Sequence, residues 1–394
     1  VPRLFKSRML PIQVALIQVS PPDDFGWMSL GVSVDITLAA AESADLVIAQ
    51  VNARMPRVLG RSFIHVNDVD VFVEHDEPLL SIGGTPEVEA AKGIARLIAS
   101  RLIEDGSTIA IGLGAASEAV LLALSNKNDL GVHTQYLTGD MMHLFSKGVV
   151  TNRKKGFNDG KIVASSAIGN EEFYGFLNDN PAIEFYPSDY VNDPTVIARH
   201  KNMVAMAVAM TMDLTGQVAA DAMPQNRLSG VTGVVDFIRG ATMSPGGKSI
   251  LILPSTGQQG RKSRIVPLLA DTAVVVTRSD VQHVVTEFGA VNLFGKSLQE
   301  RAMAMISIAH PKFRDELFSE AKKMGLLSAE RTLHESIHGV YPIHLEEVIE
   351  IEGEVVTIRP AKPVDDRLIQ EPFYSLYKDD VVARFFKEKS RFTR

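Results

Sequence analysis

The chain has 394 residues, 45% of them hydrophobic and 22% charged, which is typical of a globular protein and excludes a mainly disordered, collagen-like or coiled-coil chain. Its 47 acidic and 40 basic residues give a net charge of −7, so no overall positive field attracts nucleic acid or an anionic membrane. The absence of cysteine excludes disulfides, thiolate nucleophiles and cysteine-based zinc sites.

The apolar runs are all shorter than the ~20 residues that a membrane span needs. No signal-peptide pattern follows Val1. We therefore expect a cytoplasmic protein with neither a membrane nor a nucleic acid as partner. The length is typical of two or three domains.

Short runs of β-branched and other apolar residues recur along the chain and predict buried strands. They occupy residues 13–18, 44–51, 108–111, 162–165, 249–254 and 272–277. Residues 85–105 have apolar side chains at helical spacing behind Thr85, with Glu87 and Glu89 in the expected first turn. Strands that alternate with helices predict an α/β fold with largely parallel sheets.

Residues 109–120, IAIGLGAASEAV, predict a strand, a glycine turn and a helix. The turn contains Gly112 and Gly114, and such a turn lets backbone amides approach an anion closely. Ser117 stands where the dinucleotide-binding fingerprint has its third glycine or alanine. On this motif alone, a tight strand-to-helix turn is favoured over a Rossmann site.

The last part of the chain differs in character from the rest. An acidic stretch at residues 344–354 is followed by a predicted strand at 355–358 and a charged tail. We expect boundaries near residues 328 and 355, while frequent glycine and proline between 181 and 247 predict many tight loops.

His334, Glu335 and His338 match the H-E-x-x-H pattern, which on a helix places two imidazoles around zinc with a glutamate as general base. Gly339 and Pro342 would end such a helix at once. We favour chance occurrence and predict no metal site. The remaining histidines lack ligand spacing and are interpreted as structural.

Several long segments are specific enough to indicate a family. They are residues 14–35 (VALIQVSPPDDFGWMSLGVSVD), 51–70 (VNARMPRVLGRSFIHVNDVD), 129–140 (DLGVHTQYLTGD), 236–256 (DFIRGATMSPGGKSILILPST), 284–302 (VVTEFGAVNLFGKSLQERA) and 308–317 (IAHPKFRDEL). Through these segments the chain resembles the acetyl-CoA hydrolase/transferase family over residues 10–327, most closely its 4-hydroxybutyrate CoA-transferase branch.

The resemblance implies an α/β architecture of two open-sheet CoA-transferase-fold domains, residues 1–125 and 126–327, with the first N-terminally incomplete. A connecting segment, 328–354, would follow. Residues 355–394 resemble the opening strand and helix of a GNAT-type N-acetyltransferase domain.

The resemblance also implies a reaction. Members of the family transfer coenzyme A from a short-chain acyl-CoA to a small carboxylic acid in the cleft between the two domains. A glutamate attacks the thioester, while amides of glycine loops hold the oxyanion. Coenzyme A is then a substrate, no cofactor is permanently bound, and a homo-oligomer is expected.

The chain departs from the family pattern where the nucleophilic glutamate is expected, because Gln135 follows the Gly-Val-His-Thr segment. A second departure is at residues 230–234, which read GVTGV where the family typically shows G-x-G-G-Q. Either the transferase chemistry is lost or altered, or Gln135 is an engineered replacement. Because Thr232 and Val234 also differ, natural divergence is favoured.

The candidate site residues follow from this comparison. They are Gln135, Gly230 and Gly233 at the catalytic position, and Gly112, Gly114, Lys248 and Lys262 for binding CoA. Asp140 is a candidate for activating water, and Glu287 is expected to have a structural or substrate-positioning role. The expected function is CoA transfer with doubtful activity; the alternatives are a non-catalytic acyl-CoA-binding module of a larger acetyltransferase fusion, or an acyl-CoA hydrolase.

Overall fold

The computed structural model describes residues 1–81, 89–223, 226–227, 233–270, 272–333, 347–351 and 354–359. The chain divides into two compact units, Val1–Ala329 and Glu330–Arg394. This division lies beside the boundary that the sequence predicts near residue 328.

A nine-stranded sheet forms the centre of the first unit, in the order β21-β20-β16-β11-β7-β8-β9-β10-β4. Neighbouring strands are parallel except at the β20–β21 edge. The central strands are buried on both faces, as their continuous apolar sequences predict. The strands are β4 (Leu59–Gly60), β7 (Thr108–Ile111), β8 (Gly131–Thr138), β9 (Ile162–Ile168), β10 (Ile183–Phe185), β11 (Met203–Val208), β16 (Lys248–Ile252), β20 (His283–Thr286) and β21 (Gly289–Asn292).

The order of the strands reverses in the middle of this sheet. From β7 the chain proceeds outward through β8, β9 and β10, and it then returns to the other side of β7 to form β11, β16 and β20. The reversal between β7 and β11 is a topological switch point. In open α/β sheets, ligands bind outside the carboxyl ends of the strands at such a point.

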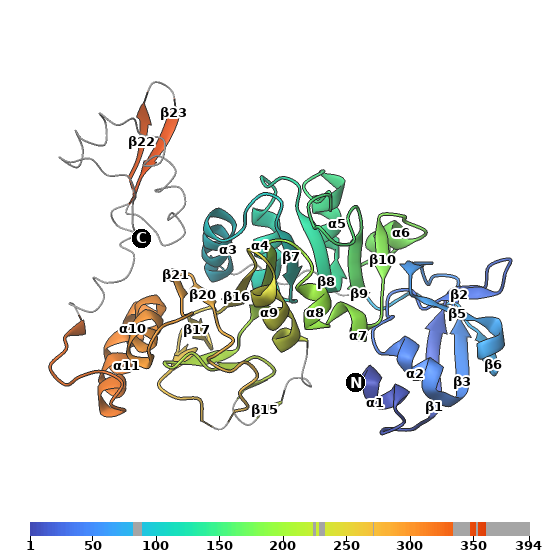
Figure 1. The fold of residues 1–394 in the computed structure, drawn as a ribbon, viewed down its shortest axis with the longest axis horizontal. Helices are drawn as coiled ribbons and strands as arrows, with labels where there is room; N and C mark the ends of the chain where they lie inside the picture. Colours follow the sequence, from blue (N-terminus) through green and yellow to red (C-terminus); the bar gives the residue numbers. More distant parts are fainter. Residues whose placement is uncertain are drawn as a thin grey trace, which may run out of the picture. The chain divides into compact units, whose positions relative to one another are not determined.

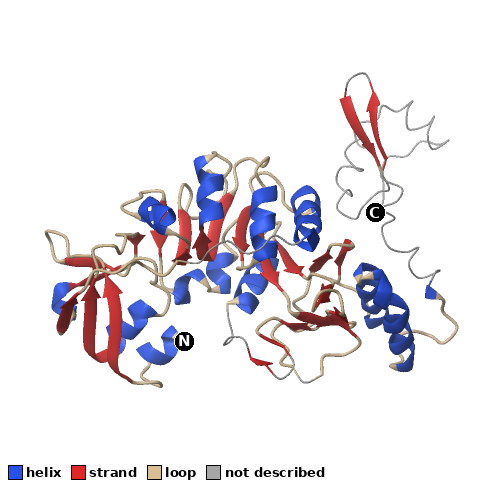
Figure 2. Ribbon diagram, turned by 180° about the vertical axis from the view of Figure 1, so that it is seen from behind, coloured by secondary structure: helices blue, strands red, loops and turns tan. Residues whose placement is uncertain are grey.

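Helices cover both faces of the sheet (Figures 1 and 2). On one face lie α3 (Glu89–Arg101), α4 (Ala115–Ala123), α5 (Gly139–Ser146) and α6 (Glu171–Leu177). On the other lie α7 (Ser188–Val191), α8 (Pro194–Ile197) and α9 (Val234–Met243). Apolar side chains of these helices and of the strands between them form the core.

A smaller parallel sheet precedes the central one, in the order β1-β3-β6, with β1 at its outer edge. It comprises β1 (Ile12–Val19), β3 (Ala44–Val51) and β6 (Val71–Glu74), accompanied by α1 (Pro2–Lys6), α2 (Thr37–Ser43), η1 (Val66–Asp68) and the antiparallel pair β2 (Trp27–Ser29) and β5 (Phe63–His65). β4 leaves this region and joins the edge of the nine-stranded sheet, so the two sheets are directly connected.

Short elements complete the chain. They are β12 (Thr211–Asp213), β13 (Val218–Ala219) and β19 (Ile265–Val266), the pairs β14 (Ala222–Met223) with β15 (Asn226–Arg227) and β17 (Thr256–Gly257) with β18 (Lys262–Ser263), and the helices α10 (Leu298–Ile308) and α11 (Pro311–Lys323). α10 begins with a capping box between Ser297 and Glu300. In the second unit, β22 (Glu347–Ile351) pairs with β23 (Glu354–Ile358).

The structure confirms most of the predicted elements and corrects one. Residues 272–277 were expected to form a strand, but only Val276 pairs, in an isolated bridge with Val218. β13, which contains Val218, is only two residues long. The apolar β-branched residues at 272–277 therefore have no strand long enough to pair with along their length. The expected boundary at residue 125 falls between β7 and β8, which pair within one sheet.

Two further predicted elements border residues that lie outside the described part of the chain. α3 begins at Glu89 in the described chain, while Thr85 lies outside it. β23 confirms the strand expected at 355–358, and residues 360–394 lie outside the described part, so the acetyltransferase resemblance stays a prediction.

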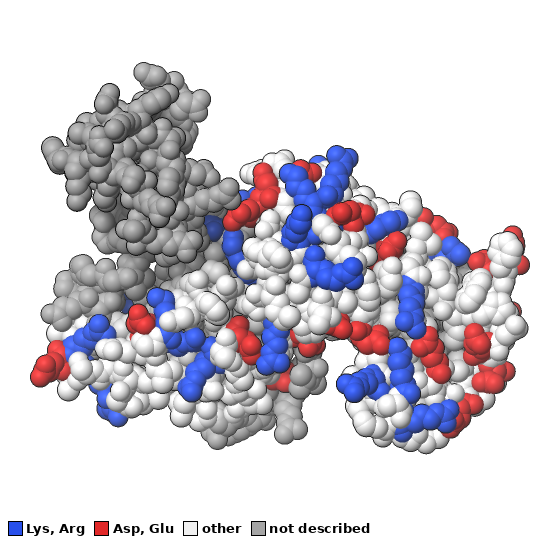
Figure 3. Space-filling view, in the orientation of Figure 1, with Lys and Arg blue, Asp and Glu red and all other residues white. Residues whose placement is uncertain are grey.

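The distribution of surface charge and the apolarity of the helices are relevant to nucleic acids and membranes as possible partners. In Figure 3, basic and acidic side chains intermingle over the visible described surface. Among the described helices, none combines the length and apolarity that crossing a bilayer requires.

Candidate functional site

A cavity of about 300 Å³ opens at the carboxyl ends of β7, β8 and β11, at the switch point of the central sheet. Backbone and side chains of these strands and of the first turns of α9 line it. The lining residues are Ala110–Leu113, Thr134, Gln135, Tyr136, Met206–Val208, Met210, Ala220, Gly233, Val234 and Phe237. Most are apolar, with Thr134, Gln135 and Tyr136 supplying polar side chains. This composition suits the acyl end of an organic ligand.

Gln135 and Gly233 meet in this cavity, although they are far apart in the sequence. A Cβ atom at Gly233 would lie 2.8 Å from Oε1 of Gln135 and 2.5 Å from Nδ2 of Asn192. Both distances are shorter than a non-bonded carbon permits. Gly233 has a φ of −70°, so its backbone conformation does not call for glycine, but a methyl group there would displace the ends of both side chains.

Tyr136 is half-buried beside Gln135. Burial raises the pKa of its hydroxyl, the negative charge of Asp35 raises it further, and a hydrogen bond with Gln135 opposes these effects. The phenol therefore stays neutral over the physiological range. This pair of side chains in the second half of β8 offers an uncharged carboxamide and an uncharged hydroxyl.

The glycine turn after β7 lies on the same cavity. Gly112 lines it, and its N–H donates a hydrogen bond to the carbonyl oxygen of Met206 on β11 (3.0 Å). Gly114 has a φ of +114° and is the residue before the first turn of α4. That backbone conformation strains any residue with a Cβ atom, so the turn depends on glycine there.

A buried basic cluster, His133, His200 and Lys155, includes a residue of the strand that carries Gln135, since His133 lies on β8 two residues before Gln135. The rings of His133 and His200 have centroids 4.4 Å apart, and Nζ of Lys155 donates to the carbonyl oxygens of Val132 (2.8 Å) and Lys161 (2.6 Å). All three side chains of the cluster are fully buried. Lys155 thus ties β8 to the segment that leads into β9.

Burial shifts the ionisation of all three groups toward the neutral form. It lowers the pKa of Lys155 to about 7, with Asp159 and Glu184 opposing the shift. It lowers the pKa of His133 to about 3 and that of His200 to about 2, and the neighbouring positive charge of Lys155 lowers both further. Both imidazoles are therefore neutral at neutral pH and serve as packing groups.

The two lysines proposed for CoA phosphates do not line the cavity. Lys248 begins β16 at the amino edge of the sheet, and its Nζ lies 2.6 Å from Oε1 of Glu104. Lys262 lies on the exposed β17–β18 pair. Gly230 lies outside the described residues.

Two carboxylates singled out in the sequence also do not line the Gln135 cavity. Asp140 is in the first turn of α5; burial raises its pKa, the charge of Glu118 adds to this, and His143 opposes it. Glu287 accepts hydrogen bonds from the N–H (2.9 Å) and the hydroxyl (2.6 Å) of Ser255. Its contacts fix the loop after β16.

The H-E-x-x-H segment, residues 334–338, lies outside the described residues. Within the described ranges, no group of three or more histidine, aspartate or glutamate side chains is arranged to hold a metal ion.

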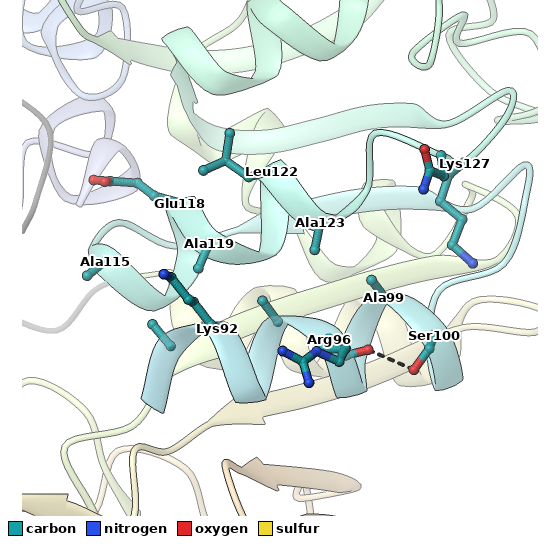
Figure 4. A pocket seen from close by; sticks show the side chains of 13 residues that line it. Lys92, Arg96, Ala99, Ser100, Ala115, Glu118, Ala119, Leu122, Ala123 and Lys127 are labelled. Carbon is teal, nitrogen blue, oxygen red and sulfur yellow. Dashed lines mark hydrogen bonds between the residues drawn. The ribbon is translucent and has the colours of Figure 1, made fainter. Parts of the chain in front are cut away.

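A separate groove of about 630 Å³ lies between α3 and α4 (Figure 4). Alanines at four-residue spacing form its floor, and Lys92, Arg96, Glu118, Leu122 and Lys127 surround them. The alanines are Ala91, Ala95 and Ala99 of α3 and Ala115, Ala119 and Ala123 of α4. Small residues at this spacing let two helices pack closely, and the groove shares no residue with the Gln135 cavity.

Sequence reasoning missed Asn192, Tyr136 and Phe237 as neighbours of Gln135. Tyr136 follows Gln135 in the chain, so the sequence alone could have indicated a polar side chain beside the expected nucleophile position. Asn192 and Phe237 reach the site only through packing of α7 and α9 on the sheet, and no local pattern marks them.

The chain is similar to known proteins over most of its length. The N-terminal domain of acetyl-CoA hydrolase/transferase matches residues 1–82, and the C-terminal domain of the same family matches residues 169–321. The 4-hydroxybutyrate coenzyme A transferase of Clostridium kluyveri is 50% identical over 324 residues, which are 82% of this chain and 75% of that protein.

Two solved structures are also similar. RipA from Yersinia pestis has a TM-score of 0.78 and 42% identity, covering 83% of this chain and 73% of that one. The 4-hydroxybutyrate CoA-transferase from Porphyromonas gingivalis has a TM-score of 0.74 and 41% identity, covering 82% and 78%. The chain therefore belongs to the acetyl-CoA hydrolase/transferase family.

Proposed function

We propose that this chain binds an acyl-CoA thioester with its acyl carbonyl beside Gln135, and that the glutamate-dependent transfer of CoA to a carboxylic acid is disabled by this carboxamide. One observation carries the proposal. Gln135 and Gly233 touch inside a cavity at the switch point of the sheet, where the family resemblance expects the nucleophile and a close backbone approach.

The chemistry of the family explains why the carboxamide matters. A glutamate carboxylate attacks the thioester carbonyl, the C–S bond breaks, and CoA leaves as a thiolate. The thiolate then attacks the γ-carbonyl of the resulting anhydride, which releases the first acid and leaves a glutamyl-CoA thioester. An acceptor carboxylate reverses these steps with its own acyl group. The nitrogen lone pair of a carboxamide is delocalised into its carbonyl group, and its oxygen carries no full charge, so Gln135 does not begin this sequence.

The remaining groups support binding more than hydrolysis. Asp140, the candidate for activating water, does not line the cavity. Tyr136 and Gln135 supply neutral hydrogen-bonding groups, and Gly112 and Gly233 keep backbone close to the bound carbonyl. The 4-hydroxybutyrate type of acyl group, the homo-oligomeric state, the cytoplasmic location and the acetyltransferase-like C-terminal segment remain predictions from the sequence.

Gly233→Ala tests the proposed binding site. The added methyl group must displace the side chains of Gln135 and Asn192, so we expect acyl-CoA affinity to fall by about 10-fold or more. Isothermal titration with butyryl-CoA measures the change. Gly175→Ala is the matched control, because a Cβ atom there meets no atom within 4 Å. Equal affinity in the two variants would contradict the placement of the ligand.

A further inference from the structure

A second cavity, of about 710 Å³, is also lined by Tyr136. β1, the segment before α2, the segment after β6 and the carboxyl end of β9 enclose it. Tyr136 lines both this cavity and the one that contains Gln135. The two cavities therefore share the residue that follows Gln135 in the chain.

The charged side chains that line the second cavity are all acidic. Asp35 and Glu77 contribute carboxylates, and its described lining contains no lysine, arginine or histidine. The remaining lining is apolar or neutral; it includes Leu16, Leu30 and Leu79. An anionic group placed here would be repelled and would find no cation to pair with.

Hydrogen bonds hold both carboxylates in place. Asp35 accepts bonds from the hydroxyls of Ser33 and Ser166 (both 3.0 Å) and from the backbone N–H of Ile36. Glu77 accepts bonds from the side-chain amides of Gln18 (3.2 Å) and Gln50 (3.0 Å). The donors are all neutral, so the negative charges are positioned without being cancelled.

The field of Asp35 reaches Tyr136, since after burial it is the second cause that raises the pKa of the phenol. The charge therefore acts at the junction of the two cavities and not only at the outer surface. A ligand that passes Tyr136 experiences this negative potential.

We propose that the second cavity is the subsite for the distal part of the acyl group or acceptor acid, and that it selects chains ending in an alkyl, hydroxyl or ammonium group over chains ending in a carboxylate. This inference rests on the proposed function, because it places the reacting carbonyl at Gln135. Asp35 and Glu77 determine the preference by repulsion.

Titration of the unaltered protein with two four-carbon thioesters tests the inference. 4-Hydroxybutyryl-CoA and succinyl-CoA differ at the distal position, where one has a hydroxyl and the other a carboxylate. We expect succinyl-CoA to bind at least about 10-fold more weakly. Free CoA, titrated in parallel, reports on the proposed function alone.

Glu77→Lys reverses one of the two charges at an exposed position. It should reduce the ratio of the dissociation constants of succinyl-CoA and 4-hydroxybutyryl-CoA about 5-fold or more. Glu172→Lys is the matched control: it makes the same charge change on the exposed face of α6, outside both cavities, and should leave the gap unchanged.

Two results would overturn the assignment while leaving the proposed function intact. One is equal affinity for the two thioesters in a protein that binds CoA, and the other is a Glu77→Lys effect no larger than that of Glu172→Lys. Failure of CoA itself to bind would overturn the proposed function, and the subsite would fall with it.

Discussion

Replacing Gln135 by glutamate should give the chain the CoA-transferase activity that, in our proposal, the carboxamide prevents. The substitution is nearly isosteric and places a carboxylate in the cavity at the carboxyl ends of β7, β8 and β11. We expect turnover of butyryl-CoA with an acceptor acid to rise by at least about 1,000-fold, because a carboxylate nucleophile replaces a carboxamide. A steady-state assay of acyl transfer to acetate measures the change.

The restored reaction should also pass through a covalent intermediate that can be detected. In the Gln135→Glu variant, acyl-CoA without an acceptor should leave CoA attached to residue 135, detectable by mass spectrometry of the intact protein. Gln299→Glu on the exposed surface of α10 is the control, since it adds the same charge away from the cavity. Comparable turnover in Gln299→Glu, or an inactive Gln135→Glu variant that still binds acyl-CoA, would contradict the assigned role of the position.

The buried basic cluster should make the protein more stable as the pH rises. The pKa of Lys155 is about 7 in the folded chain, compared with 10.5 for an unshifted lysine. Between these values the unfolded chain holds a proton that the folded chain has released. Unfolding then takes up a proton, so its free energy rises with pH by at most about 1.4 kcal/mol per unit.

The two histidines act in the same direction at lower pH. Their folded pKa values of about 3 and about 2 lie below the ordinary 6.5, so stability is lost as the pH falls below about 6.5. The loss should amount to several kcal/mol by pH 4. Urea unfolding between pH 4 and 9.5 measures both effects.

Lys155→Met distinguishes the contribution of Lys155 to the pH dependence of stability from that of the two histidines. Methionine removes the buried charge while retaining an unbranched side chain, so the rise in stability between pH 7 and 9.5 should disappear and the loss below pH 6.5 should remain. Lys154→Met is the control, because Lys154 is exposed and pairs with Asp129 at 2.9 Å. An unchanged slope above pH 7 in Lys155→Met would show that Lys155 is not the group responsible.

Local sequence predicted the strands and the glycine turn well. The apolar runs at 44–51 and 108–111 coincide with β3 and β7, and Gly112 and Gly114 lie in the expected turn before α4. These features depend on neighbouring residues only. The run at 272–277 failed because a strand also needs a partner, and partners are set by packing of distant segments.

The site could be predicted only in part, and for a similar reason. The contact between Gly233 and Gln135 agrees with the family resemblance, which no periodicity could supply. Lys248 was chosen because it follows a glycine pair in the chain, yet a residue that begins a parallel strand lies at the amino edge of the sheet. It does not line the cavity beside Gln135. The ring contact between His133 and His200 and the hydrogen bond from Lys155 to Val132 join separate segments and left no local signal.

The most direct test of the account is a crystal structure of the unaltered protein with butyryl-CoA bound. We expect the acyl carbonyl to lie in the cavity beside Gln135, Tyr136 and Gly233, with the thioester bond intact. Density for the thioester in the α3–α4 groove instead, with the Gln135 cavity filled only by water, would contradict it.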